Sequence, residues 1–335
     1  MKTKAILLLA AGLTLSSSLF AQVGDAIGQV DNSQQRRALE RSATATLQPG
    51  ETAAEAYEGE QSDVGPQTVI RYPARHTWVR ASADVIYYRT DNMFLLDDFR
   101  QEADVLVSTI EAAITPPSVT LAGGDLAARA GYRHQWYDFG LLGGNVDGSP
   151  TKLDTFDFNA GTAFADVAWQ RGGWTHGIGF DYTRLTGTES GDEFYGEYVA
   201  RWHVDYSLPL CPKSSLTFSY NGDYRWSDPS GAYLLADRDN LDRTDHALTA
   251  LLNFQLCRHA LLQPYYRFKF TRFTSQPARD DYLHTLGLGV YCPINKVLGV
   301  RFFAAWETRS VCGNTLAQDY EKFDIGGGLN VTFRF

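Results

Sequence analysis

The chain has few lysines, two methionines and four cysteines, and outside its first residues it has no long apolar run. Seven lysines accompany 23 arginines, and the 39 acidic residues outnumber these 30 basic ones. A protein that neutralises nucleic acid phosphates usually carries a basic excess, so this charge balance argues against such a partner. A transmembrane helix needs about 18 or more consecutive apolar residues. Because no such run follows the N-terminus, the sequence excludes helical membrane spans.

The chain also lacks the short motifs that mark metal and catalytic sites. No Cys-x-x-Cys pair, no Gly-x-Ser-x-Gly elbow and no His-Glu-x-x-His pair is present. His203 and Asp205 stand two residues apart, a spacing that lets one strand present both side chains on one face. Since no second acidic pair accompanies them, we predict that they belong to a structural network. The sequence therefore predicts no enzyme, no metal and no cofactor.

Residues 1–21 have the three parts of a secretory signal peptide. Lys2 and Lys4 precede an apolar stretch over residues 5–15, and the small residue Ala21 suits cleavage by signal peptidase. Because no cysteine follows the expected cut, a lipoprotein signal is disfavoured. We expect an exported chain with Gln22 as its first mature residue.

Residues 22–75 have little hydrophobic periodicity and are rich in Gln, Ala, Glu, Gly, Thr and Ser. The composition allows a short helix over residues 34–46. That helix would lack the apolar stripe by which a helix usually docks onto a protein. We therefore predict a flexible periplasmic segment.

From residue 76 to residue 335, apolar and polar side chains alternate with the period of a β-strand. At the C-terminus, Phe323, Ile325, Leu329 and Phe333 alternate with polar or small residues. Strands of about ten or more residues exceed those of a soluble sandwich and can cross a bilayer at a tilt. A weaker strand at residues 103–114 completes an even number of strands. We predict a transmembrane antiparallel up-and-down β-barrel of about 12 strands, with 10 or 14 as the alternatives.

The connections between the predicted strands alternate in length. Residues 170–173, 208–214, 257–259 and 292–296 are short connections, whereas 140–153, 185–193, 227–244, 274–281 and 310–320 are longer and acidic. Outer-membrane barrels have short periplasmic turns and longer outer loops. Cys211, Cys257 and Cys292 fall on the predicted periplasmic side and Cys312 on the outer side, with a bridge between Cys257 and Cys292 as one alternative. The acidic cluster within residues 237–245 is interpreted as part of a solvated loop.

Two segments resemble porin-type outer-membrane β-barrel proteins. They are Tyr87–Leu95, an aromatic strand end with an Asp-Asn turn, and Phe323–Phe335, the glycine-rich last strand. The resemblance covers residues 76–335 and implies an outer-membrane location in a Gram-negative cell. It also implies insertion by the barrel assembly machinery, which recognises the last strand, with Phe333 and Phe335 as the assembly signal. It implies no catalytic residue.

Along these strands the charged residues point toward the lumen, where basic side chains outnumber acidic ones in the predicted register. Arginine suits such a wall, because its guanidinium stays charged and can bond both oxygens of a carboxylate. The candidate lumen-lining residues are Arg80, Arg129, Arg133, Glu197, Arg201, His203, Asp205, Arg225, Arg267, Lys269, Arg301 and Glu307.

Two functional hypotheses follow from a charged lumen inside a barrel. The first is a porin or export channel for small anionic or saccharide solutes. The second is a structural or surface-glycan-contacting barrel with a plugged lumen and no transport. The expected partners are outer-membrane lipids, lipopolysaccharide and the barrel assembly machinery, and no nucleic acid.

Overall fold

The computed structural model describes residues 26–39, 77–227, 241–257, 259–274, 279–313 and 318–335. Besides a helix over residues 26–39 and the 3-10 helix η1 (Leu153–Phe156), these residues form a 13-stranded sheet. Its strands are β1 (Val79–Thr90), β2 (Ala103–Ile114), β3 (Val119–Leu121), β4 (Gly124–Phe139), β5 (Phe158–Arg171), β6 (Trp174–Gly187), β7 (Glu193–Cys211), β8 (Ser214–Ser227), β9 (Arg243–Cys257), β10 (Ala260–Phe273), β11 (Arg279–Pro293), β12 (Leu298–Gly313) and β13 (Tyr320–Arg334).

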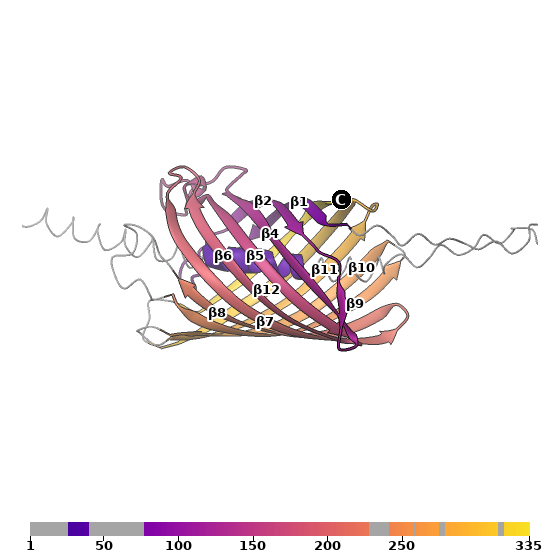
Figure 1. Ribbon diagram of the computed structural model, residues 1–335. Helices are drawn as coiled ribbons and strands as arrows, with labels where there is room; N and C mark the ends of the chain where they lie inside the picture. The colour runs from indigo at the N-terminus through magenta and orange to yellow at the C-terminus, as the bar shows by residue number, and fades with distance from the viewer. Residues whose placement is uncertain (1–25, 40–76, 228–240, 258, 275–278, 314–317) are drawn as a thin grey trace, which may run out of the picture.

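All strands except the three-residue β3 close into one barrel (Figure 1). Neighbours pair antiparallel in sequence order from β4 to β13, and β13 pairs with β1, β1 with β2, and β2 with β4. Because each long strand has a partner on both sides, no edge is left and the backbone groups are bonded, as the interior of a bilayer requires. The predicted 12-stranded antiparallel barrel is confirmed, including the weak strand at residues 103–114.

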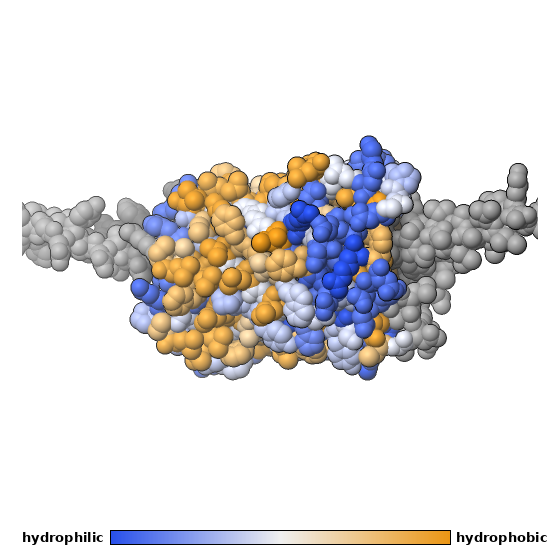
Figure 2. Space-filling view, turned by 180° about the vertical axis from the view of Figure 1, so that it is seen from behind, coloured by the Kyte–Doolittle hydropathy of each residue, from blue (hydrophilic) through white to orange (hydrophobic). Residues whose placement is uncertain are grey.

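Side chains alternate between the lumen and the outer face, because successive residues of a strand point to opposite sides. On β13, Lys322 and Asp324 are each 2% exposed, whereas Phe323 and Ile325 are 42% and 54% exposed. Figure 2 shows apolar side chains over much of the outer face that it presents. An apolar outside around a charged inside is the arrangement that lipid favours for a closed barrel.

The two ends of the barrel differ in their connections. At the turn end, most strands are joined by two to four residues, namely 172–173, 212–213, 258–259 and 294–297, and β2 is joined to β4 by the longer stretch 115–123, which contains β3. At the loop end they are joined by the longer stretches 91–102, 140–157, 188–192, 228–242, 274–278 and 314–319. The start of β1 and the C-terminal Phe335 both lie at the turn end, where Phe335 and Val79 exchange backbone hydrogen bonds. The predicted alternation of turns and loops is therefore present.

The helix over residues 26–39, which we call the lumenal helix, lies inside the barrel, and Figure 1 shows it behind the front strands. We expected these residues to belong to a flexible segment, and here the structure differs from the prediction. Residues 22–25 and 40–75 of that segment and the predicted signal peptide lie outside the described residues. Within the described part of the chain, no helix combines the length and the apolar character needed to cross a membrane.

Candidate functional site in the barrel lumen

The lumenal helix runs through the lumen from the loop end toward the turn end. Ala26 and Val30 in its first turns pack in a buried apolar cluster that includes Met93 and Phe139 at the loop end. At the other end, the carbonyl of residue 39 accepts a 3.1 Å hydrogen bond from Nε2 of Gln263, which lies near the turn end of β10. A helix of this length spans about 21 Å. It therefore fills the lumen over much of the barrel's height.

Apolar packing closes part of the loop end around the start of the helix. Met93, in the connection between β1 and β2, and Leu153 of η1 are each 4% exposed although both belong to connections. They share one cluster with Tyr137 and Phe158, whose rings stack with their centroids 4.4 Å apart. This cluster holds the two connections against the helix.

Asp157 follows η1 at the same end and has a perturbed pKa. Its Oδ1 accepts a 2.7 Å hydrogen bond from the backbone N–H of Phe139. Partial burial and the nearby carboxylates of Asp138, Asp154 and Glu189 raise the pKa of Asp157 to about 6. The negative charge of this group of carboxylates at the loop end therefore decreases as the pH falls through about 6.

Arg37 attaches one face of the helix to β1 and β2. Its Nη2 lies 2.6 Å from Oδ1 of Asp84, and its Nη1 lies 3.0 Å from Oε2 of Glu111. The same carboxylates also contact arginines of the wall, since Asp84 pairs with Arg301 and Glu111 pairs with Nε of Arg133 at 3.1 Å. The helix thus adds one cation to a network that the wall already forms.

Arg36 attaches the neighbouring part of the helix to β13. Its Nη2 lies 2.6 Å from Oδ2 of Asp324, which is also 3.5 Å from Nζ of Lys322. The Arg36 guanidinium lies over the rings of Tyr88 and Phe303, with its carbon 4.4 Å and 4.1 Å from the two centroids. This guanidinium is therefore held by a carboxylate and by two aromatic faces.

Asp31 attaches another face of the helix to β8 and β10. Its Oδ1 lies 3.0 Å from Nη1 of Arg225, and its Oδ2 lies 2.9 Å from Nζ of Lys269. Asp245, on β9 between these strands, approaches both cations at 3.1 Å. The helix therefore presents an acid to one part of the wall and two arginines to another.

Three neutral side chains of the helix add hydrogen bonds to the wall. Each bond joins one helix residue to one residue of a different strand, so they fix the height of the helix. They are Tyr88 Oη to Gln29 Oε1 at 2.6 Å, Gln135 Nε2 to Ser33 Oγ at 2.7 Å and Arg267 Nη1 to Gln35 Oε1 at 2.7 Å.

Most of the predicted lumen-lining residues take part in these contacts or in ion pairs of the wall. Arg225, Arg267 and Lys269 contact the helix directly. The pairs formed among wall residues are Arg129 and Arg201 with Asp166, Arg133 with Glu111, Glu197 with Arg225, Arg301 with Asp84, and Glu307 with Lys322.

The remaining predicted residues lie away from the helix contacts. Nε2 of His203 is 3.9 Å from Oδ2 of Asp205, too far for a hydrogen bond, and both lie on β7. Arg80 lies on β1 near the turn end. Phe333 and Phe335, the predicted assembly signal, are 47% and 69% exposed at the end of the chain. Among the described residues, no contact joins His203, Asp205, Phe333 or Phe335 to the helix.

The helix residues and part of the acidic wall were not predicted from the sequence. The docking of the helix was not predicted because most of its partners are polar and lie far away in the sequence. The helix therefore lacks the apolar stripe that would have indicated docking. Asp245 was assigned to a loop, although it alternates with Arg243 and Ala247 on β9 as an inward residue does. The additional inward carboxylates make the wall less basic than predicted. The missed residues are Asp31, Arg36, Arg37, Glu111, Asp166 and Asp245.

The four cysteines are free thiols, so the alternative bridge between Cys257 and Cys292 is not formed. Sγ of Cys211 lies 3.0 Å from Oγ of Ser214 across a turn. Among the described residues, no group of three or more His, Cys, Asp or Glu side chains is placed to hold a metal ion.

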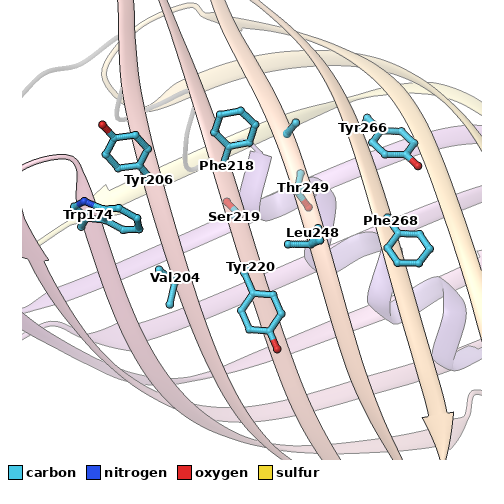
Figure 3. Close-up of a pocket in the computed structure, with 11 residues that line it drawn as sticks. Trp174, Val204, Tyr206, Phe218, Ser219, Tyr220, Leu248, Thr249, Tyr266 and Phe268 are labelled. Carbon is cyan, nitrogen blue, oxygen red and sulfur yellow. The ribbon is translucent and has the colours of Figure 1, made fainter.

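A hollow of 480 Å³ lies on the outer face of the barrel, across β6 to β10. Figure 3 shows its aromatic lining, to which Trp174, Tyr206, Phe218, Tyr220 and Tyr266 contribute from four strands. Aromatic rings at the outside of a barrel face lipid and its interface. The hollow is therefore part of the lipid-facing surface and is separate from the lumen.

No protein-family model matches the chain, and no curated protein matches it. Among solved structures, the β-domain of the Bordetella autotransporter BrkA is 14% identical, covers 76% of this chain and all of its own, and has a TM-score of 0.45. An outer-membrane channel from Pseudomonas putida F1 is 9% identical over 80% of this chain and all of its own, with a TM-score of 0.47. An anion-selective porin from Comamonas acidovorans is 10% identical over 77% of this chain and 99% of its own, with a TM-score of 0.39. The likeness is one of fold.

The closed ring of strands, the apolar outer face and the unequal ends are the features of a barrel that spans the outer membrane. A charged lumen occupied by a helix distinguishes the inside of this barrel. The chain is a closed β-barrel of twelve antiparallel strands, of the kind that spans the outer membrane.

Proposed function

We propose that the chain is an outer-membrane channel for small anionic or saccharide solutes, and that the lumenal helix closes it in the described state. The observation that carries this proposal is that the wall pairs its own charges. Without Arg37, Asp84 retains Arg301 and Glu111 retains Arg133. An open state therefore avoids the cost of leaving a buried carboxylate unpaired, which is about 3–5 kcal/mol.

The same holds for the other attachments of the helix. Without Arg36, Asp324 retains Lys322, and without Asp31, Lys269 retains Asp245. Apart from the contacts of Arg36 with the rings of Tyr88 and Phe303, the contacts that are lost are ion pairs and hydrogen bonds, which water replaces at a net cost of about 0.5–1.5 kcal/mol for a typical bond. These contacts suit a helix that leaves its place and returns to it.

A permanently plugged barrel that contacts surface glycans through its outer loops is the second candidate. The apolar cluster around Ala26 and Val30 favours it, because water does not replace contacts of this kind. Burial of one Val side chain contributes about 1.5–3 kcal/mol. Ala26 and the partly buried Ile27 add to this contribution, but only these three side chains of the helix pack in the cluster, whereas most of its other described contacts are polar. We therefore favour the channel.

Conductance of the refolded protein in planar bilayers separates the two candidates. The double variant Arg36→Gln, Arg37→Gln removes two cations of the helix and retains its hydrogen-bonding capacity. We expect it to be open for a larger fraction of time than the wild type, with a reversal potential under a KCl gradient that indicates anion preference. If the helix becomes mobile in this variant and the current does not rise, the barrel is no channel.

A cross-link provides the matching closed control. With the four cysteines replaced by serine, Ser33→Cys and Gln135→Cys place two thiols where a 2.7 Å hydrogen bond now joins the side chains. A short cleavable bifunctional thiol reagent should abolish the current, and cleavage of the reagent should restore it. The same reagent on Gln135→Cys alone should leave the current unchanged.

We also propose that the barrel assembly machinery recognises β13 through Phe333 and Phe335 and that the outer loops contact lipopolysaccharide. The exposure of both rings at the chain end supports the first of these proposals. Deletion of Phe335 should slow the appearance of heat-modifiable barrel in cells, whereas substitution of the outward Leu329 by Ile should not. Equal rates for the two variants would contradict recognition of the terminal ring.

A further inference from the structure

Asp31 is held by the wall as a bound ligand would be held. Each of its carboxylate oxygens has its own cation, Arg225 at 3.0 Å and Lys269 at 2.9 Å. The Asp31 side chain is 12% exposed, and those of Arg225 and Lys269 are 8% and 11% exposed. Two separately placed cations thus hold one carboxylate that is largely shielded from bulk water.

These cations accept one carboxylate more than the wall itself supplies to them. Arg225 is already paired with Glu197 at 3.1 Å and with Asp223 at 3.0 Å, and Lys269 with Asp245 at 3.1 Å. Both cations therefore bind the carboxylate of Asp31 in addition to the carboxylates of the wall. We propose that Arg225 and Lys269 form a binding site for the carboxylate group of a solute, and that Asp31 occupies this site in the described state. This inference rests on the proposed channel function and names the solute's recognised group.

The neighbouring charges select a single negative charge. Asp245 lies 3.1 Å from both Arg225 and Lys269, so a dianion such as phosphate would be repelled at close range. A neutral sugar would offer no charge to the two cations, whereas a carboxylate offers two oxygens at the separation that Asp31 shows. The solute class is therefore a monocarboxylate, such as a sugar acid or a short organic acid.

Chemical rescue tests the site in the full-length protein. Asp31→Ala removes a carboxylate of about the size of formate, and formate should bind the purified variant saturably in isothermal titration at constant ionic strength. Formamide, its neutral counterpart, should not bind, and the wild type should bind formate at least about tenfold more weakly because Asp31 competes. In a variant that also carries Arg36→Gln and Arg37→Gln, whose helix we expect to leave the lumen more often, D-glucuronate should bind and D-glucose should not.

Two further variants locate the site. In the Asp31→Ala background, Lys269→Met should weaken formate binding about tenfold or more, because one of two charge-assisted hydrogen bonds is lost. Arg267→Gln removes a lumenal cation that contacts Gln35 and no carboxylate of the helix, and it should change the binding less than about twofold. Formate binding that survives Lys269→Met, or that is absent from Asp31→Ala, overturns the site.

The titration needs no current, so the site and the channel can fail separately. Formate binding without any conductance in the Arg36→Gln, Arg37→Gln variant would preserve the site and remove the channel. Conductance in that variant without formate binding to Asp31→Ala would preserve the channel and remove the site. Should Asp31→Ala fail to fold, Asp31→Asn provides a second variant that lacks the carboxylate. Formate would then compete with a neutral side chain for Arg225 and Lys269.

Discussion

Arg37→Met should release the lumenal helix from one wall of the barrel while it leaves the helix propensity of the segment nearly unchanged. Methionine has a similar length and forms helices almost as well as arginine. The change removes contacts of 2.6 Å to Asp84 and 3.0 Å to Glu111 from a side chain that is 9% exposed. Hydrogen bonds to charged groups contribute about 1.5–3 kcal/mol each, and rehydration of two carboxylates offsets part of that loss.

The wall limits the size of the effect. Because Asp84 retains Arg301 and Glu111 retains Arg133, neither carboxylate is left unpaired. We therefore expect a net loss of about 2 kcal/mol, below the ~3–5 kcal/mol for breaking a buried pair completely. This corresponds to a shift of about 30-fold in the docking equilibrium of the helix.

Two measurements check this value independently. A spin label at the exposed residue 38 in a cysteine-free background reports helix mobility, and bilayer current reports opening. Asn32→Met is the matched control, because residue 32 lies about 140° around the helix from residue 37. We expect both signals to rise in Arg37→Met and to stay near the wild type in Asn32→Met. Unchanged mobility in Arg37→Met would refute the assignment of Arg37 as an anchor.

Three further predictions concern the barrel outside the helix contacts. The pKa of Asp157 is raised to about 6 from a usual 3.8, so folding takes up a proton at pH values between the two. The wild type should therefore gain stability as the pH falls from about 6 to 4, and melting curves of Asp157→Asn should lack this gain. A Cβ at Gly326 would lie 2.3 Å from the carbonyl oxygen of Tyr87. Gly326→Ala should therefore lower the heat-modification temperature by an amount equivalent to about 1–3 kcal/mol. Gly289→Ala should not lower it, because the nearest atom to a Cβ at this position would be 3.6 Å away. A membrane-impermeant maleimide should label Cys312 in intact cells and no other native cysteine, and labelling of a turn-end cysteine would reverse the assigned orientation.

The architecture of the barrel could be predicted because it rests on a local pattern. Alternation over Tyr320–Arg334 identifies one strand without knowledge of its neighbours, since each outward residue meets lipid and each inward residue does not. The weak strand Ala103–Ile114 could be predicted because an even number of strands places the start of the first strand and the end of the last strand on the same side of the membrane. Closure then fixes the pairing of β1 with β13.

The occupant of the lumen could not be predicted in the same way. Alternation assigns Asp84 and Lys269 to the inside, but it does not say which charge each one meets. The polar partners of residues 26–39 are separated from them by 47 to 288 positions in the sequence. A helix that docks through ion pairs lacks the apolar stripe on which recognition of a docked helix depends. The composition of residues 22–75 therefore predicted a flexible segment, although part of it is held on several sides.

The arrangement of the charges favours one rotational setting of the helix in the lumen. It also limits which contacts of the helix an acidic solute can replace. In the order of strands around the barrel, β8, which carries Arg225, lies opposite β1, which carries Asp84. Asp31 and Arg37 reach these opposite walls from different faces of the helix, and half a turn about its axis would set Arg37 against Arg225 and Lys269. A carboxylate that takes the place of Asp31 removes only the contacts on the β8 and β10 side. Arg37 still holds the other side, so binding of an acidic solute would tilt the helix away from one wall before the helix leaves the lumen.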